Sequence, residues 1–235
     1  MYPGGKGSTF RVLINQMPPH RRYFELFLGD GAVMRNKRPA GYNLGMDIDP
    51  EPVATVRADL CFSHAKNGDI SGSFSFVVGD AIPLLQAGQF GPGDFLNLDP
   101  PYLMETRRQK RPLYNCEFGQ AEDHETFLAA VLALPPGPMV MICGYWSQLY
   151  ETRLRGWRRV DYPAQTRSGA TAVESIWMNY PEPVRLHDYS FLGDNFRERE
   201  RIGRKAKRWV AGLQRLPILE QKAILAQMKE NGLID

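Results

Sequence analysis

Predicted strands that end in glycine or aspartate, separated by predicted helices, constrain the fold of this chain more than any other feature. Apolar runs predict strands over residues 23–28, 43–47, 74–78, 95–98 and 139–143. Helices are expected over residues 8–17, from residue 32, from residue 50 and over residues 124–134. Two later strands, near residues 157–162 and 172–180, are expected to form a hairpin. Because strands alternate with helices, the sequence predicts an α/β fold with a doubly wound, mainly parallel sheet.

The ends of the predicted strands carry the candidate binding groups. Gly29-Asp30-Gly31 follows the first strand, and the next three strands end at Asp47, Asp80 and Asp99. In open parallel sheets, ligands bind beyond the carboxyl ends of the strands, so we expect these residues to form one rim. The third glycine of the GxGxxG fingerprint is missing from GDGAVM, which disfavours a nicotinamide cofactor.

A rim rich in carboxylates suits a ligand that carries positive charge, and this favours S-adenosylmethionine over a phosphate-bearing nucleotide. Asp47 is placed to hydrogen-bond two ribose hydroxyls, and Asp80 to accept from an adenine amino group. The alternative for both aspartates is that they cap the helices that follow them. The N-terminal PGGKGS lacks the preceding strand and the Lys-Ser/Thr pair of a phosphate loop, so Lys6 is expected to reach a ligand carboxylate instead.

Five motifs, in order, resemble a known family: YPGGKGS, FELFLGDGAV, MDIDP, VVGDA and LDPPY. They are similar to the motifs of the Dam-type DNA adenine-N6 methyltransferases, and small phage-borne members look closest. The resemblance spans about residues 1–183 and includes HETFL, MICGYWSQLYE and ESIWMNYPEP. It implies a Rossmann-like methyltransferase fold and a cofactor site for S-adenosylmethionine. The cofactor-binding residues that we predict are Tyr2, Lys6, Phe27, Gly29, Gly31, Asp47, Ile48, Asp80 and Ala81.

The tetrapeptide Asp99-Pro100-Pro101-Tyr102 is the predicted catalytic motif. An adenine amino nitrogen becomes a better nucleophile when both of its hydrogens are engaged by acceptors. The Asp99 carboxylate and the Pro100 carbonyl can supply the two acceptors, and consecutive prolines keep the backbone rigid and free of N–H donors. Tyr102 offers an aromatic face on which the base can stack.

Two basic segments, residues 107–111 and residues 195–235, predict a polyanionic partner. The resemblance implies that this partner is DNA, as a duplex or as a single strand. Residues 195–235 hold 10 Lys/Arg and 5 Asp/Glu, a net charge of +5, against −2 for the rest of the chain. We therefore expect a methyltransferase domain over residues 1–183 and a basic helical appendage over residues 184–235. The predicted nucleic-acid contacts are Arg107, Arg108, Lys110, Arg111, Tyr114, Arg204, Lys205, Lys207 and Arg208. The alternative is that these basic residues are simply solvated.

The interval from Asp47 to Asp99 is only 52 positions long and leaves no room for the target-recognition region that Dam-type enzymes carry there. Sequence readout is therefore expected from the short loop after Tyr102 and from the tail.

Two alternative functions remain: an RNA or protein methyltransferase of the same fold, and a non-enzymatic nucleic-acid-binding protein. Asp99, where those other methyltransferases carry asparagine, disfavours the first, and the intact DPPY motif with both loop glycines disfavours the second. The cysteines and histidines are scattered and do not have the spacing of a metal site. No segment is apolar enough to predict a membrane span, and a cytoplasmic location is expected.

Overall fold

The computed structural model of the chain describes residue 7 and residues 9–67, 72–107, 118–165 and 171–234, of which residues 61–67 are described by their backbone only. The chain divides into two compact units, Met1–Tyr189 and Ser190–Asp235, and each is described by itself.

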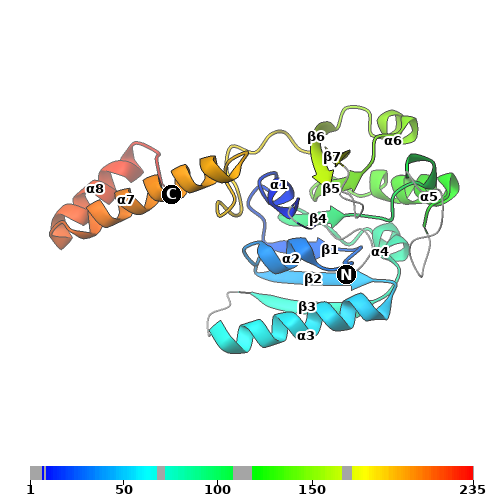
Figure 1. Ribbon diagram of the computed structural model, residues 1–235, viewed down its shortest axis with the longest axis horizontal. Coiled ribbons are helices and arrows are strands. Elements are labelled where there is room, and N and C mark those ends of the chain that lie inside the picture. Colours follow the sequence, from blue (N-terminus) through cyan, green and yellow to red (C-terminus); the bar gives the residue numbers. More distant parts are fainter. Residues whose placement is uncertain (1–6, 8, 68–71, 108–117, 166–170, 235) are drawn as a thin grey trace. The chain divides into compact units, whose positions relative to one another are not determined.

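The first unit is built on a seven-stranded sheet in the order β3-β2-β1-β4-β5-β7-β6 (Figure 1). Its strands are β1 (Arg22–Glu25), β2 (Tyr42–Asp47), β3 (Ser73–Val78), β4 (Asp94–Leu98), β5 (Met139–Gly144), β6 (Arg158–Gln165) and β7 (Thr171–Met178). The first five pair in parallel, whereas β7 is antiparallel to both β5 and β6. The chain moves outward from β1 to β3 and then returns to the other side of β1 with β4, so the strand order reverses between β1 and β4. That reversal is the place where open α/β sheets bind ligands.

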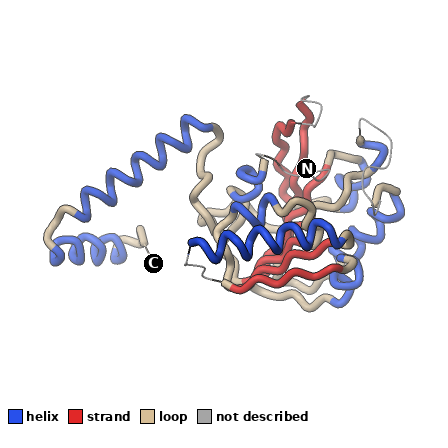
Figure 2. The backbone as a smooth tube through the Cα atoms, turned by 60° about the horizontal axis from the view of Figure 1, so that its bottom comes forward, coloured by secondary structure: helices blue, strands red, loops and turns tan. Residues whose placement is uncertain are grey.

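Helices flank the sheet, as Figure 2 shows. They are α1 (Phe10–Ile14), α2 (Ala32–Asn36), α3 (Pro50–Asn67), α4 (Ala81–Ala87), α5 (Ala121–Leu132) and α6 (Gln148–Arg153), with a short 3₁₀ turn at Met104–Thr106. Helix α5 buries His124, Phe127, Leu128 and Val131, which share one face at helical spacing. The three apolar side chains among them pack with Leu96 of β4 and with other strand residues in the main hydrophobic core.

Strand β4 lies at the centre of the sheet, and every one of its residues is buried. At its start, the Asp94 carboxylate accepts hydrogen bonds at 2.6 Å and 2.5 Å from Nε and Nη2 of Arg22, the first residue of β1. Such a bidentate pair holds two strands in a defined register. Because β1 and β4 are held together at their starts, their carboxyl ends lie side by side, with Glu25 opposite Asn97.

The predicted fold class is confirmed, including the C-terminal hairpin formed by β6 and β7. The first helix is shorter than predicted, because α1 ends at Ile14 and not at Met17. Met17 precedes Pro18, and a residue before proline is disfavoured in helical conformation. The first strand ends at Glu25 and not at Leu28, since the chain turns there into the glycine loop. The six-residue helix α6 was not predicted.

The first unit extends six residues beyond the predicted boundary at residue 183. The reason is that His187 and Asp188 bind back to this unit. The backbone N–H of His187 donates to the Met17 carbonyl at 2.8 Å, and the Asp188 carboxylate accepts from the Arg38 N–H at 2.7 Å.

The second unit consists of α7 (Phe196–Gln214) and α8 (Ile218–Glu230). Asn195 caps α7 by accepting a hydrogen bond from the Glu198 N–H at 3.0 Å. Neither helix has a fully buried side chain, and Trp209 of α7 is 68% exposed. In the part of the chain that the structure describes, no helix has both the length and the apolar character needed to cross a membrane.

Candidate active site at the carboxyl ends of β1, β2 and β4

The glycine loop after β1 is held against its neighbours by backbone contacts. Gly31 has φ 63°, in the left-handed region, and a Cβ there would lie 2.9 Å from the Val56 side chain of α3. The N–H of Gly29, whose φ is 48°, donates to Oδ2 of Asp47 across 2.8 Å. The loop therefore needs glycine at both positions, and it is tied to the end of β2.

Asp47 is 8% exposed, and each of its carboxylate oxygens accepts one backbone hydrogen bond. Oδ2 accepts from Gly29, and Oδ1 accepts from the N–H of Asp49 at 3.0 Å. Burial raises the pKa of Asp47 above its ordinary value, and the backbone hydrogen bonds act in the opposite direction. An ionised carboxylate has about four lone-pair sites, so these two bonds leave it able to accept from ligand hydroxyls.

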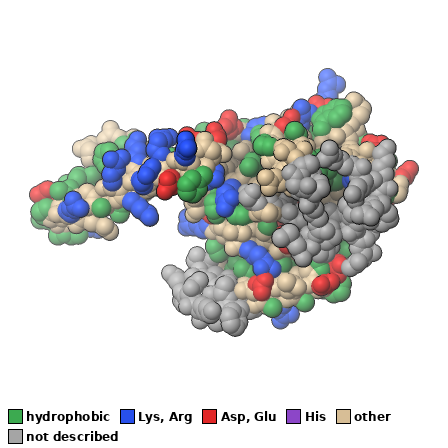
Figure 3. All heavy atoms as spheres, viewed as in Figure 1, with side chains coloured by type: hydrophobic (Ala, Val, Ile, Leu, Met, Phe, Trp, Pro, Cys, Tyr) green, Lys and Arg blue, Asp and Glu red, His purple; other side chains and the backbone are tan. Residues whose placement is uncertain are grey.

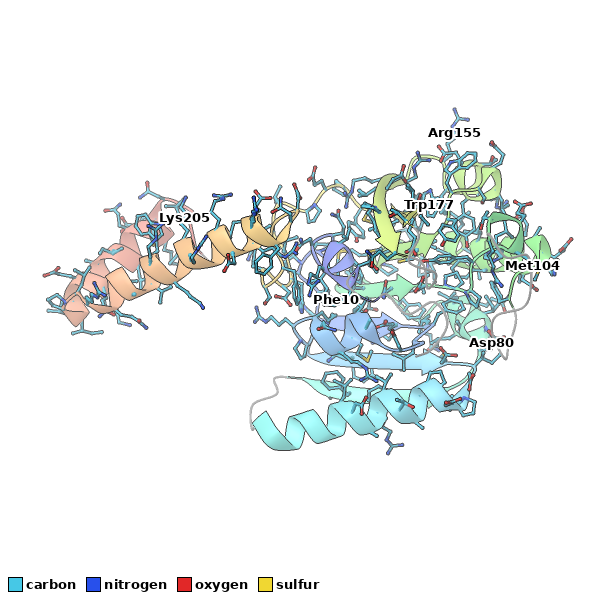
Figure 4. The ribbon with its side chains drawn as sticks, viewed as in Figure 1. Phe10, Asp80, Met104, Arg155, Trp177 and Lys205 are labelled. Carbon is cyan, nitrogen blue, oxygen red and sulfur yellow. The ribbon has the colours of Figure 1, made fainter. Side chains whose placement is uncertain are left out.

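The other predicted cofactor residues occupy different environments. Ile48 is 50% exposed directly after β2, as a side chain that contacts a ligand has to be. Asp80 is exposed and caps α4, because its Oδ1 accepts from the Ile82 N–H at 2.9 Å (labelled in Figure 4). The capping alternative for Asp80 is thus realised. Ala81 is buried, and Phe27 packs against the rings of Phe118 and Phe127 in the core.

The tetrapeptide Asp99–Tyr102 follows directly on β4, beside the glycine loop of β1. Its Tyr102 hydroxyl donates to Oε2 of Glu174 on β7 at 2.9 Å, and the Tyr102 ring lies 4.8 Å from the ring of Tyr145 in an edge-on arrangement. Tyr145 follows directly on β5, the strand next to β4. Neither Tyr145 nor Glu174 was predicted as a site residue.

Arg107 requires a correction. It was predicted to contact phosphates from a surface knot, but its side chain is buried, with 6% exposure. Its Nε donates to the Tyr102 carbonyl at 2.6 Å. The guanidinium therefore supports the backbone of the tetrapeptide, and its burial leaves little of it exposed for a phosphate contact.

A buried histidine–tyrosine pair lies behind the tetrapeptide. His124 Nδ1 is 2.7 Å from the Tyr150 hydroxyl, and its Nε2 is 3.1 Å from the Phe118 carbonyl. Burial lowers the pKa of His124 to about 4, so the ring is neutral at pH 7. Burial, with the nearby Asp99 carboxylate as a smaller cause, raises the pKa of Tyr150, which keeps its hydroxyl proton. The sequence motif HETFL contains His124, but nothing in the sequence indicated that its ring would pair with the Tyr150 hydroxyl.

A second carboxyl group, that of Glu25, lies at the end of β1. Glu25 is 4% exposed, and its Oε2 accepts from the Tyr23 hydroxyl at 2.9 Å. Burial is the main cause that raises the pKa of Glu25 to about 8, and Asp99 and Asp30 add to the rise. A Glu inside an otherwise apolar strand is a signal that could have marked it as a site residue.

Several predicted residues lie outside the described part of the chain: Tyr2, Lys6, Arg108, Lys110, Arg111 and Tyr114. The predicted tail residues are all exposed on α7: Arg204, Lys205, Lys207 and Arg208. Lys and Arg side chains line this helix (Figure 3), and Lys205 is labelled in Figure 4. Among the described residues, no group of three or more His, Cys, Asp or Glu side chains could hold a metal ion.

No protein-family model matches the sequence, and no curated protein matches it. Among solved structures, an S-adenosylmethionine-dependent methyltransferase from Methanosarcina mazei is similar with a TM-score of 0.50 at 11% identity, covering 71% of this chain and 95% of that one. TrmK of M. capricolum in complex with S-adenosylhomocysteine has a TM-score of 0.44 at 8% identity, covering 95% and 96%. An S-adenosylmethionine-dependent methyltransferase from Agrobacterium tumefaciens has a TM-score of 0.47 at 13% identity, covering 73% and 60%. The similarity to the M. mazei protein shows that the sheet of this chain has the Rossmann-like fold of such methyltransferases.

Proposed function

We propose that this protein methylates the exocyclic N6 amine of adenine in DNA, with S-adenosylmethionine as the methyl donor. One observation carries the proposal: the DPPY tetrapeptide follows the central strand β4 at the strand-order reversal, next to the β1 glycine loop. This arrangement brings two hydrogen-bond acceptors, the Asp99 carboxylate and the Pro100 carbonyl, to the edge of the sheet where the glycine loop lies. A nucleoside ligand is expected to bind at that edge.

The residues at the ends of β1 and β2 fit the proposed cofactor. S-adenosylmethionine supplies a methyl group bonded to a positively charged sulfur. Gly31 lets the loop pack closely against Val56 of α3, and Asp47 retains acceptor capacity for ribose hydroxyls. Ile48 offers an exposed apolar surface for the adenine ring of the cofactor.

In the proposed reaction, the protein orients the target amine by accepting a hydrogen bond from each of its two N–H groups. The Asp99 carboxylate and the Pro100 carbonyl accept the two N–H bonds, which concentrates the nitrogen lone pair on the side facing away from the protein acceptors. The ring of Tyr102 stacks on the base and fixes its plane. The amine sheds one proton after the methyl group has been transferred, and no covalent intermediate with the protein is formed.

An adenine inside a duplex cannot reach this pocket, so the base has to be flipped out or presented on a single strand. Flipping costs a few kcal/mol, which contacts to DNA phosphates offset. With Arg107 buried, the exposed basic residues of α7 are the described candidates for such contacts. Arg108, Lys110 and Arg111 remain candidates from the sequence alone.

The decisive experiment is modified-base sequencing of DNA from cells that express the protein, with Asp99→Ala as the matched control. We expect N6-methyladenine only with the wild-type protein, while Asp99→Ala still binds S-adenosylmethionine. If wild-type expression leaves DNA adenine unmodified and instead methylates RNA or protein in the presence of labelled cofactor, the DNA assignment is wrong. A protein that binds DNA but no cofactor would instead be a non-enzymatic binding protein.

A further inference from the structure

The side chain of Glu174 joins the edge hairpin of the sheet to the tetrapeptide. Its Oε2 accepts from the Tyr102 hydroxyl at 2.9 Å and from the Tyr162 hydroxyl at 2.7 Å. Tyr162 lies directly opposite Glu174 in the antiparallel pairing of β6 with β7. One carboxylate oxygen thus links Tyr102, the last residue of the tetrapeptide that follows β4, to both strands of the hairpin.

A carboxylate is an unexpected residue at this point of β7. Side chains two residues apart share a face of a strand, so Glu174 lies on the same face as Ile176 and Met178, both of which are 0% exposed. A half-buried charge is costly unless hydrogen bonds satisfy it. Two phenol donors meet that requirement here, and one of them belongs to the proposed base-stacking residue.

Contacts with three described residues hold Tyr102 in place. Its hydroxyl donates to Glu174, its ring lies 4.8 Å from Tyr145 at an interplanar angle of 71°, and its carbonyl accepts from Arg107. The Arg107 contact orients the backbone, whereas the Glu174 contact fixes the far end of the ring. An aromatic ring anchored at both ends has little freedom to rotate, so a base that stacks on it meets a preformed surface.

We propose that Glu174 is a positioning residue for base recognition, which fixes the plane of the Tyr102 ring and thereby the direction in which the target amine faces Asp99. This inference rests on the proposed function. The hairpin formed by β6 and β7 thus takes part in presenting the base, together with the tetrapeptide.

The test is a double-mutant cycle of Tyr102→Phe and Glu174→Ala, with kcat and KM for DNA measured for each protein. Tyr102→Phe keeps the ring and removes only the hydroxyl. Because a hydrogen bond to a charged group is lost in either single variant, each should lower kcat about tenfold, and the double variant should be no worse than the single ones. Glu174→Gln keeps an acceptor oxygen and should restore most of the activity. If the loss of kcat in the double variant equals the product of the losses in the two single variants, the inference is overturned.

Tyr162→Phe is the matched control, because it removes the other donor to the same oxygen and leaves the Tyr102 contact in place. It should lower kcat by no more than about twofold. A loss equal to that of Tyr102→Phe would mean that the carboxylate supports only the packing of the hairpin, and would overturn the positioning role. The affinity for S-adenosylmethionine, which should stay unchanged in every variant, reports whether each protein is folded.

A second readout does not depend on methyl transfer. The affinity of a single-stranded oligonucleotide of deoxyadenosines is compared with that of the same strand carrying abasic positions. The preference for the adenine strand should fall by the same factor in Glu174→Ala and in Tyr102→Phe, and an unchanged preference would overturn the inference. If the wild-type protein shows this preference but no methylation of DNA adenine, the proposed function fails while the role of Glu174 stands.

Discussion

The carboxylate of Asp47 accepts a hydrogen bond from the backbone N–H of Gly29 across 2.8 Å, and this contact helps to tie the end of β2 to the loop after β1. The same carboxylate also accepts from the N–H of Asp49. Asp47 therefore has a structural task in shaping the glycine loop, in addition to its proposed contact with ribose hydroxyls.

The first prediction is that Asp47→Ala weakens the binding of S-adenosylmethionine much more than it lowers turnover at saturating cofactor. The loss of a charged hydrogen-bonding partner should cost about 1.5–3 kcal/mol of binding free energy. Asp59→Ala on α3 is the control, because Asp59 is exposed and pairs only across the surface with Arg35. Calorimetric titration measures both, and equal affinities for the two variants would contradict the assignment of Asp47.

The second prediction compares two glycines. Gly31→Ala should destabilise the protein and reduce cofactor affinity, because the residue has φ 63° and the new Cβ would lie 2.9 Å from Val56. The strain of such a backbone should cost on the order of 1–3 kcal/mol of unfolding free energy. Gly203→Ala in α7 meets open space, so it should stabilise that helix by about 0.5–1 kcal/mol. Denaturant titration of both variants tests the contrast.

The third prediction concerns pH and the buried Glu25. Its pKa is raised to about 8 from 4.5, so the folded state holds this proton more tightly than the unfolded state. The contribution of Glu25 to stability is therefore fully present below about pH 4.5 and is lost as the pH rises through about 8, on the order of 1.4 kcal/mol for each pKa unit. Glu25→Gln should remove this dependence. The groups that act on the Glu25 carboxyl are Tyr23, Asp30, Lys37 and Asp99.

Unfolding free energies of the wild type and Glu25→Gln, measured from pH 5 to pH 8, should diverge as the pH rises, with the wild type losing stability relative to the variant. Burial also lowers the pKa of Lys37 to about 7 and of His20 to about 2, but both residues are present in both proteins. Parallel pH profiles would show that Glu25 does not titrate in this range.

The strand-end aspartates and the glycine loop could be predicted from sequence because each follows an apolar run directly along the chain. The contacts of Tyr102 could not, since Glu174 lies 72 residues away and reaches it only through the order β4-β5-β7. Arg107 was misjudged for a related reason. Its basic neighbours indicated a surface patch, whereas the nearby Tyr102 carbonyl draws its guanidinium inward. Local patterns predict elements and their ends, but contacts across the sheet need the strand order.

The fourth prediction is that the enzyme recognises a short or relaxed DNA target. The interval from Asp47 to Asp99 is taken up by α3, β3, α4 and β4, with only residues 68–71 outside the described part. Readout then falls to the loop after Tyr102 and to the tail, and each good base contact discriminates by about 1–3 kcal/mol. We expect about two to four defined bases in a methylome, and a stringent site of six or more would contradict this.

The fifth prediction concerns the tail, and it depends on the two faces of α7. Arg197, Arg201, Arg204 and Arg208 recur at intervals of three or four residues, so they share one face of the helix. Glu198 and Glu200 pair with Arg201 and Arg204 at 3.3 Å and 3.9 Å, but these exposed pairs are weak. The opposite face carries apolar side chains, among them the exposed Trp209.

If α7 binds DNA phosphates, a chain that ends after Tyr189 should stay folded, bind DNA more weakly and show a shallower dependence of affinity on salt, because fewer counterions are released. The chain is cut there because His187 and Asp188 still bind the first unit. Replacing Arg204 and Arg208 by Gln in the full chain is the matched test, since it removes two charges and leaves the apolar face intact. It should reduce the salt slope by about two. A truncated protein that changes its oligomeric state with an unchanged salt slope would show instead that the apolar face of the tail packs against a second subunit.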